Sequence, residues 1–372
     1  MKLLIGGDFV PGKWIGSALE RKNYSFLDDF RNLAKDADLS IINLECPFIK
    51  NGEKPIEKYG PNLGCDPKAA NAVAYAGIGL VTLANNHIKD YGESALRRTI
   101  QCCESAGVAT VGVGSDNLDA SKPFIFNHNG ESVGIINCCE HEFSIATESS
   151  AGANALDPIK QYYQIKELKR EVDYVVVIVH GGHENFNLPS LRMQKNYRFF
   201  VDAGADAVIN HHQHCYSGYE LYKEKPIFYG LGNLCFEDEG NSPESWFEGF
   251  LVYINLEKNI TFEIHPYIQF KDDKMLKLSY DSKILDNIEE LNTVINDDTL
   301  LKERLRDYYE KSSINIPMVF DLYTNKFLLK LRYHHLLPSF FNKKLKLRIQ
   351  NHVLCESHFD KLKYFFTRKL GI

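Results

Sequence analysis

Near the start of the chain, Lys2–Asp8 reads Lys-Leu-Leu-Ile-Gly-Gly-Asp, a short apolar run that ends in two glycines and a carboxylate. Consecutive apolar residues suit a strand buried on both faces, because successive side chains point to opposite faces of a sheet. Similar runs recur along the sequence, at Leu39–Glu45, Ile78–Ala84, Ala109–Val113, Tyr174–His180, Ala207–Asn210 and Pro226–Tyr229. We therefore expect a sheet of buried strands, of which Lys2–Asp8 is the first.

Helical patterns lie between these runs. Apolar residues recur with a 3.6-residue period in Ser25–Ala37, Gly92–Ala106 and Pro189–Ala203. Two other segments carry turn signals between β-rich arms and predict hairpins: Phe124–Cys139 around Asn129-Gly130, and Gly249–Phe270 around Lys258-Asn259. Strands that alternate with helices and are interrupted by hairpins indicate an α/β fold with mixed sheets.

The character of the sequence changes after residue 280. Strand signals stop near Asp281, and helical patterns follow in Arg304–Lys311 and Phe341–Cys355. We expect one α/β domain over residues 1–280 and a basic helical C-terminal region over residues 281–372.

The composition, with 44% hydrophobic and 25% charged residues, is that of a globular protein and excludes a disordered chain. The net charge of −6 is unevenly distributed, because residues 321–372 hold 11 Lys and Arg against 3 acidic residues. Two interpretations of this basic segment stay open: it lies on an anionic membrane surface, or it packs on the acidic body. We favour packing for its apolar residues, Phe327, Leu328, Leu331, Leu336, Leu337, Phe340 and Phe341. No nucleic-acid partner is expected.

The nine cysteines and the apolar runs bear on the compartment. The cysteines show no C-x-x-C spacing, so we expect free thiols in a reducing environment. No signal-peptide pattern precedes Lys2–Asp8, and no apolar run reaches the roughly 18 residues that span a bilayer. The sequence therefore predicts a cytoplasmic protein, with peripheral membrane contact through the basic segment as the alternative.

Five of the predicted strands end in, or are followed by, a polar residue that can bind a metal. These residues are Asp8, Glu45, Asn86 with His87, His180, and His212 with His214. The carboxyl ends of parallel strands meet at one edge of a sheet, and side chains held there are rigid and open to solvent. Carboxylates and imidazoles are common ligands of divalent transition metals. The pattern predicts a metal site at this edge.

The same residues carry a family resemblance through six motifs in a fixed order. They are Gly7-Asp8 with Gly12, Asn43–Pro47, Ala84–His87 with Asp90 and Gly92, His180-Gly181-Gly182 with Glu184, His211–His214, and Tyr229–Asn233. With these motifs, residues 1–240 resemble the CapA family of capsule and poly-γ-glutamate synthesis proteins. This family is a branch of the calcineurin-like metallophosphatase superfamily. The resemblance does not extend to the C-terminal region.

The resemblance implies a four-layer α/β/β/α sandwich with one or two divalent ions at the strand ends. By this likeness Asp8 and His214 would bind the first ion, and Glu45 would bridge the two. The second ion would be bound by Asn86, His180 and His212. His87 occupies the place of the general acid in metallophosphatases, and Asp90 would orient its imidazole.

The expected chemistry is metal-assisted hydrolysis. Two cations about 4 Å apart would lower the pKa of water toward neutrality and stabilise an anionic transition state, while His87 supplies a proton to the leaving group. One position departs from the superfamily: its first motif has a histidine two residues after the aspartate, and here that residue is Val10. A site with one metal ion therefore stays open beside a site with two. We expect Mn, Zn or Fe, without a preference among them.

Several neighbouring residues have two interpretations. His183 and Glu184 lie in a predicted exposed loop and either contact substrate or are surface polar groups. Asn233 either closes the rim of the site or caps a glycine turn. His211 would point away from its neighbours in an extended segment, so we expect it to be structural. We expect no nucleotide-binding loop at Gly112–Ser115, because the remaining glycine and lysine positions of such a loop are missing.

Two functional hypotheses follow. The first is a metal-dependent hydrolase of phosphoester or amide bonds, acting on an anionic polymer or a phosphorylated precursor in cell-surface polymer synthesis. The second is a non-catalytic accessory subunit that binds a polyanion or a polymer synthase. The retained ligand set with His87 favours the first hypothesis, whereas Val10 slightly favours the second.

Overall fold

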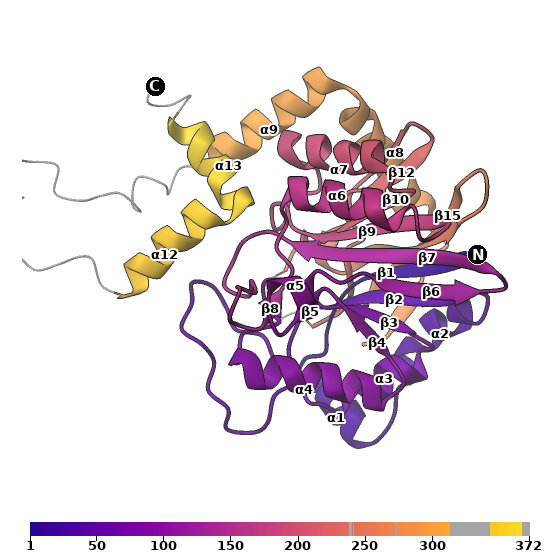
Figure 1. The fold of residues 1–372 in the computed structure, drawn as a ribbon, viewed down its shortest axis with the longest axis vertical. Helices are drawn as coiled ribbons and strands as arrows, with labels where there is room; N and C mark the ends of the chain where they lie inside the picture. Colours follow the sequence, from indigo (N-terminus) through magenta and orange to yellow (C-terminus); the bar gives the residue numbers. More distant parts are fainter. Residues whose placement is uncertain (238–239, 241, 272–273, 313–342, 367–372) are drawn as a thin grey trace, which may run out of the picture.

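The computed structural model describes residues 1–237, 240, 242–271, 274–312 and 343–366 (Figure 1). The apolar segment of the C-terminal region whose packing the sequence predicts, residues 327–341, lies outside the described residues.

The larger of two main sheets is built around the first strand. Its spatial order is β16-β15-β14-β1-β2-β3-β4, and β13 also pairs with β1. β1 pairs in parallel with β2 and β13 and antiparallel with β14. The strands are β1 (Lys2–Val10), β2 (Leu39–Leu44), β3 (Leu80–Thr82), β4 (Ala109–Val111), β13 (Asn233–Phe236), β14 (Glu248–Asn255), β15 (Thr261–Gln269) and β16 (Leu276–Leu278).

The second sheet has the order β11-β12-β10-β9-β7-β6. β7, β9, β10 and β12 run parallel to one another, while the edge strands β6 and β11 are antiparallel to their neighbours. The strands are β6 (Phe124–His128), β7 (Glu131–Cys139), β9 (Tyr174–His180), β10 (Ala207–His211), β11 (Tyr219–Tyr222) and β12 (Lys225–Phe228). A separate small sheet joins β5 (Val113–Gly114) to β8 (Gly152–Ala153).

The two sheets form the inner layers of a four-layer sandwich, and β1 shows how its residues divide. Leu3 and Ile5 share a hydrophobic cluster with Val177 of the second sheet, whereas Leu4 belongs to a second cluster with Phe30 of α2. Successive side chains of a strand point to opposite faces, so β1 contacts the second sheet on one side and helices on the other. The described helices before residue 280 are α1 (Lys13–Glu20), α2 (Asp28–Ala34), α3 (Ala69–Tyr75), α4 (Gly92–Ser105), α5 (Asn117–Ala120), α6 (Pro158–Leu168) and α7 (Leu191–Ala203).

The outer layers complete the α/β/β/α arrangement that the resemblance implied. α1 to α4 cover the larger sheet, and α6 and α7 cover the second sheet (Figure 1). Both predicted hairpins are confirmed: β6 and β7 pair antiparallel around Asn129-Gly130, and β14 and β15 pair antiparallel on either side of Lys258-Asn259. The mixed sheets follow from these hairpins.

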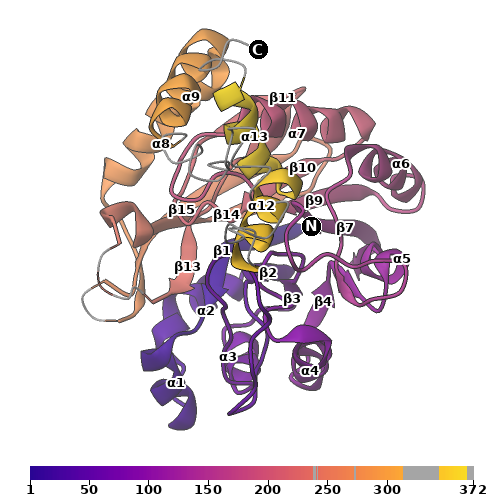
Figure 2. The same ribbon diagram turned by 90° about the vertical axis from the view of Figure 1, so that its left-hand side faces the viewer.

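Helices follow the last described strand. They are α8 (Ser282–Asn296), α9 (Asp298–Ser312), α12 (Lys343–Leu354) and α13 (Glu356–Tyr364). Ile284 and Ile288 of α8 and Leu301 and Leu305 of α9 are buried in the same cluster as the second sheet. α12 and α13 cross the side of the molecule at which the strands end (Figure 2). No helix among the described residues is long and apolar enough to span a bilayer.

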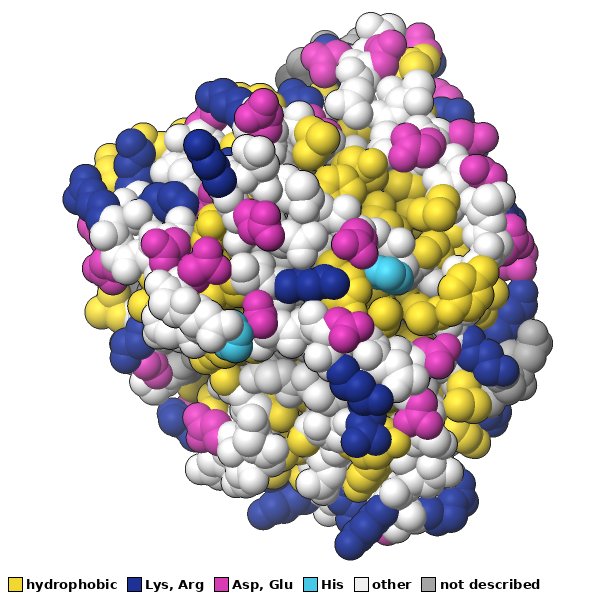
Figure 3. Space-filling view, turned by 90° about the vertical axis from the view of Figure 1, so that its right-hand side faces the viewer, with side chains coloured by type: hydrophobic (Ala, Val, Ile, Leu, Met, Phe, Trp, Pro, Cys, Tyr) yellow, Lys and Arg dark blue, Asp and Glu magenta, His cyan; other side chains and the backbone are white. Residues whose placement is uncertain are grey.

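The opposite face shows how the charge of the body is distributed. Figure 3 shows acidic and basic side chains interspersed there, with hydrophobic side chains between them. The excess of acidic residues in the body therefore does not form a single acidic surface on this face.

Candidate metal centre

The candidate ligands gather where parallel strands of both sheets end. Asp8 lies near the end of β1, Glu45 directly follows β2, and His180 is the last residue of β9. His212 and His214 follow β10. β1 is parallel to β2, and β9 is parallel to β10, so the four carboxyl ends open at one edge of the sandwich.

Close backbone packing fixes Asp8. A Cβ added at Gly7 would lie 1.8 Å from the carbonyl oxygen of Gly232, and the Asp8 amide donates to that oxygen at 3.2 Å. Only glycine permits this approach. The Asp8 carboxylate accepts from Asn43 Nδ2 at 2.7 Å and from the His212 amide at 3.1 Å. The direction of the carboxylate is thereby set by a side chain of β2 and an amide of the turn after β10.

The side chains form three groups whose ligand atoms lie within 4.8 Å of one another. One group is Glu45, His180 and His212. Another is Asp8, Glu45 and His214, so that Glu45 is common to both. The third group contains Glu184 with His212 and His214. The first two groups have the arrangement that the resemblance implied, with Glu45 between two sets of ligands.

The surroundings of the Glu45 carboxylate show whether the site suits a metal ion. Both of its carboxylate oxygens are buried and have no hydrogen-bond partner among the described residues. His180 Nε2 lies 3.4 Å and His214 Nε2 lies 3.8 Å from Glu45 Oε1. A buried carboxylate without partners is costly, and burial accordingly raises the pKa of Glu45. A divalent cation between these groups would satisfy the carboxylate, so the residues fit a metal.

Two imidazoles of the centre are held in the neutral form that metal binding requires. His180 Nε2 lies 3.0 Å from both Asn86 Oδ1 and His212 Nδ1. Burial lowers the pKa of His180 and of His212 well below the usual range. Neutral imidazoles at 3.0 Å contact, beside an amide oxygen, are ready to donate lone pairs to a cation.

His214 is held differently. Its Nδ1 lies 3.0 Å from Asn233 Oδ1, and its ring packs against Phe236 and Trp246 at centroid distances of 5.1 and 5.2 Å. Burial acts to lower the pKa of His214, but the charges of Glu45, Asp8 and Glu184 and the hydrogen bond to Asn233 together raise it above its ordinary value. Asn233 therefore contacts a candidate ligand and leaves Nε2 of His214 directed toward Glu45.

The backbone beside these ligands is strained. His212 has φ +96° and His214 has φ +56°, in the left-handed region that residues other than glycine rarely adopt. Strained residues of this kind cluster at functional sites, because the surrounding structure has to hold them there. The His211–His214 turn thus directs two imidazoles toward Asp8 and Glu45 at a conformational cost.

His87 and Asp90 form the pair that the sequence predicts. His87 Nδ1 lies 2.6 Å from Asp90 Oδ2, and both side chains are buried. Lys58, whose side chain is 2% exposed, pairs with the other oxygen of Asp90 and lies 3.1 Å from His87 Nδ1. The Leu63 amide also donates to Asp90, at 2.7 Å. Asp90 and Lys58 thus fix the Nδ1 side of the ring, leaving Nε2 for a substrate.

Three further candidate residues differ in their exposure and contacts: His183, Glu184 and His211. His183 is buried, and its Nε2 lies 3.1 Å from the Tyr309 hydroxyl. The expectation that His183 is exposed is therefore wrong, because α9 covers it. Glu184 is exposed, and its Oε1 lies 4.0 Å from His212 Nε2. His211 is buried with Nδ1 3.5 Å from Asp8 Oδ1, behind the ligand groups.

Sequence reasoning missed two residues that position the site. Lys58 lies between β2 and α3, in a segment without a helical or strand period, so no pattern indicated its pairing with Asp90. Asn43 was noted only as part of a motif. Its Nδ2 lies 2.7 Å from Asp8 Oδ1 and 3.2 Å from His180 Nδ1. The available signal for Asn43 was a polar amide in the buried second half of β2, between Ile42 and Leu44.

Two relatives with curated names are similar to this chain over most of its length. CapA, the capsule biosynthesis protein of Bacillus anthracis, is 31% identical over 242 residues, which cover 62% of this chain and 58% of that protein. The match therefore spans less than two thirds of that relative. The PGA biosynthesis protein CapA of Bacillus subtilis (strain 168) is 28% identical over 269 residues, which cover 70% of this chain and 69% of that protein.

Solved structures with a similar fold include two enzymes. A novel phosphatase from Mycoplasma pneumoniae is 16% identical with a TM-score of 0.44, over 77% of this chain and 96% of that chain. The NAD nucleotidase NadN of Haemophilus influenzae is 12% identical with a TM-score of 0.41, over 84% of this chain and 60% of that chain.

The family model described as bacterial capsule synthesis protein PGA_cap matches residues 2–238, which include every candidate metal ligand. Because this match covers more than half of the sequence, the chain belongs to the PGA_cap family of bacterial capsule synthesis proteins.

Proposed function

We propose that this protein is a metal-dependent hydrolase of phosphoester or amide bonds that acts in the synthesis of a capsule or another cell-surface polymer. The observation that carries the proposal is Glu45, whose two buried oxygens have no hydrogen-bond partner in the described part of the chain and lie near three imidazoles. A scaffold that only binds another protein gains nothing from an uncompensated buried carboxylate. A hydrolase gains a metal ligand from this carboxylate.

The ligand groups suggest how the metal would be held. Asp8, Glu45 and His214 would bind one ion, and Glu45 with His180 and His212 would bind a second, with the Asn86 oxygen 3.0 Å from His180 Nε2. When bound, such ions supply Lewis acidity to a phosphoryl or acyl oxygen and make water a stronger nucleophile at neutral pH.

His87 would act as the general acid. With Nδ1 held at 2.6 Å from Asp90, the proton for the leaving group would be on Nε2. Lys58 balances the charge of Asp90, so the ring keeps one orientation whether or not it is protonated. Asn43 and Asn233 would position Asp8, His180 and His214 rather than contact substrate.

The relatives suggest the pathway. Both Bacillus relatives are named for capsule or PGA biosynthesis, so we place this chain in a similar pathway. Its substrate would be an anionic polymer or a phosphorylated precursor, and a polymer synthase would be a natural partner. A cytoplasmic location with peripheral membrane contact through the basic C-terminal region is part of the same proposal.

The test begins with elemental analysis of protein purified without chelator. Turnover of bis(p-nitrophenyl) phosphate and p-nitrophenyl phosphate is then measured with the metal found, for the wild type and for His87→Asn. We expect one or two transition-metal ions per chain and loss of turnover in His87→Asn with its metal retained. If no metal is present and neither manganese nor zinc is taken up, the hydrolase is excluded, and a non-catalytic accessory role becomes the better account.

A further inference from the structure

α12 and α13 lie at the same edge of the molecule as the metal centre. β7 and β9 run toward this edge in Figure 1, and in Figure 2 both helices cross in front of the ends of β1 and β2. The two views agree, so the C-terminal helices lie over the catalytic edge and not at the far end of the sandwich. Side chains of α13 can therefore contact a ligand that is bound at the metal centre.

A single buried carboxylate fixes α13 there. Glu140, directly after β7, is 4% exposed. Its Oε2 accepts from the Ser357 hydroxyl at 2.5 Å and from the Ser357 amide at 3.1 Å. Its Oε1 accepts from Arg192 Nη2 at 2.7 Å and from the Gly182 amide at 3.2 Å. Glu140 thus joins the first turn of α13 to the loop that holds Glu184.

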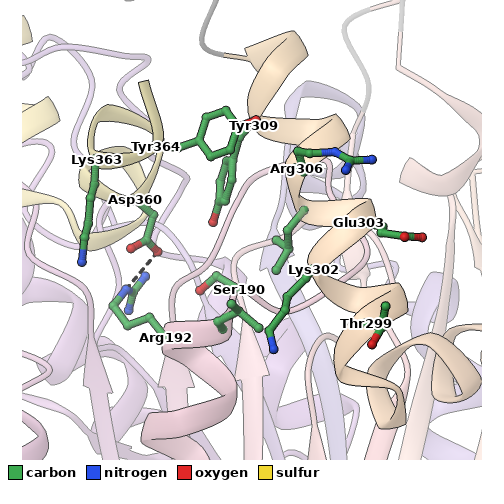
Figure 4. Close-up of a pocket in the computed structure, with 12 residues that line it drawn as sticks. Ser190, Arg192, Thr299, Lys302, Glu303, Arg306, Tyr309, Asp360, Lys363 and Tyr364 are labelled. Atoms are coloured by element: carbon green, nitrogen blue, oxygen red, sulfur yellow. Dashed lines mark hydrogen bonds and ion pairs between the residues drawn. The ribbon is translucent and has the colours of Figure 1, made fainter. Parts of the chain in front are cut away.

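Further contacts fix the rotation of α13. Arg192 Nε donates to Asp360 Oδ2 at 3.0 Å, and the Tyr364 and Tyr309 rings pack at a centroid distance of 5.2 Å (Figure 4). A pocket of about 650 Å³ lies between α7, α9 and α13 beside these contacts. With Ser357 and Asp360 both directed at the body, the residue after Asp360 has a defined place.

That residue is Lys361, and it is turned toward the site. Its Nζ lies 5.3 Å from the centroid of the Tyr308 ring. Tyr308 in turn stacks on Phe186 at 4.0 Å and lies 5.1 Å from the His183 ring. Lys361 is half-buried, and its ammonium makes no hydrogen bond or ion pair with another described residue. An ammonium held over an aromatic ring beside the His183-Glu184 loop is free to bind an anion.

A metal ion at the centre would change the charge that faces Lys361. Burial lowers the pKa of Lys361, while the charge of Glu184 acts in the opposite direction. Glu184 Oε1 is also 4.0 Å from His212 Nε2, and it belongs to one of the groups that could bind metal. When a metal ion compensates the charge of Glu184, the positive charge of Lys361 at the mouth of the centre has no compensating anion from Glu184.

We propose that Lys361 binds a second anionic group of the substrate, beside the group that the metal centre holds. The inference rests on the proposed function and narrows its substrate class to molecules with at least two negative groups. A phosphoester with a nearby carboxylate or phosphate has this chemistry. The C-terminal helix would then be part of the substrate site, although it lies outside the segment that the family model matches.

The test measures binding and needs no turnover. Isothermal titration of the manganese-loaded full-length protein compares ω-phosphonoalkanoates of three to six carbons with alkylphosphonates of equal length. The two series differ only in the terminal carboxylate. Four proteins are compared: the wild type, Lys361→Met, Lys361→Arg and, as the matched control on the same helix, Lys363→Met.

We expect the best carboxylate-bearing ligand to bind the wild type about fivefold to tenfold more tightly than its alkyl counterpart. Lys361→Met should lose this advantage and keep its affinity for the alkylphosphonates, while Lys361→Arg and Lys363→Met retain the advantage. An equal advantage in Lys361→Met and wild type, or none in the wild type, would overturn the inference. If the binding results follow this pattern but no phosphoesterase or amidase turnover is found, the anion site at Lys361 is supported and the proposed hydrolase function is not.

Discussion

Replacement of Glu45 by glutamine should change stability in opposite directions with and without metal. In the metal-free protein the two Glu45 oxygens are buried and accept no hydrogen bond from any residue that the structure describes. The uncharged amide removes the cost of burying that charge, so Glu45→Gln should be more stable than the wild type. With metal present the order should reverse, because the variant loses the carboxylate common to two ligand groups.

The size of both effects follows from the burial of Glu45. An unsatisfied buried neutral group costs about 1–3 kcal/mol and a charged one costs more, so the amide removes only the excess, an expected gain on the order of 1 kcal/mol. Metal at 100 times its dissociation constant stabilises the wild type by about 2.7 kcal/mol, most of which the variant should lose. In a chain of this length each kcal/mol shifts Tm by about 1–2 °C, so both effects are measurable.

The assay is differential scanning calorimetry of chelator-treated and manganese-loaded protein, with Glu104→Gln on the exposed face of α4 as the control. The control should behave as the wild type in both states. Should Glu45→Gln melt below the metal-free wild type, or gain as much stability from manganese, then Glu45 is not the uncompensated ligand inferred here.

Three further results are expected. Burial and the charge of Glu45 raise the pKa of Asp8 from 3.8 to about 6 in the metal-free protein. The folded state therefore holds a proton that the unfolded chain releases, and stability present below pH 4 should fall by about 3 kcal/mol as the pH rises through 6. Urea titrations of the metal-free protein should show this slope, and the slope should be smaller in Asp8→Asn. Lys58→Met should lower kcat about tenfold or more with bound metal unchanged, because the His87–Asp90 pair loses the cation that holds it. Lys58→Arg should restore part of the lost kcat. Equal kcat in Lys58→Met and wild type would exclude a positioning role for Lys58. Sedimentation with anionic vesicles should be weakened by Lys344→Glu with Lys346→Glu if the basic region contacts membranes, and unchanged pelleting would exclude that contact.

Much of the sandwich was predictable, because its strands are buried on both faces. Runs such as Tyr174–His180 have no polar side to conceal the pattern. The hairpin at Asn129-Gly130 was equally clear, because both turn residues adopt positive φ. β13 was not predicted: its four residues follow a glycine turn, and they form a strand only because β1 provides a parallel edge.

The site was predictable to the extent that its residues follow strands. Asp8, Glu45 and His180 meet because the ends of parallel strands meet. The surroundings of His183 were not predictable, since Tyr309 lies 126 residues further along the chain. The pairing of Lys58 with Asp90 was not predictable either, because it depends on the path of an irregular segment. Contacts between distant segments have no periodic signal in a single sequence.

The close approach of Gly7 to Gly232 limits how the candidate metal centre can change in sequence. A side chain at residue 7 would collide with backbone, so no neighbouring rotamer change can make room for it. In a deep mutational scan, position 7 should tolerate nothing but glycine, even in a selection for folding alone. The position of the Asp8 main chain is thus fixed by a second stretch of backbone and not by side chains that could be exchanged.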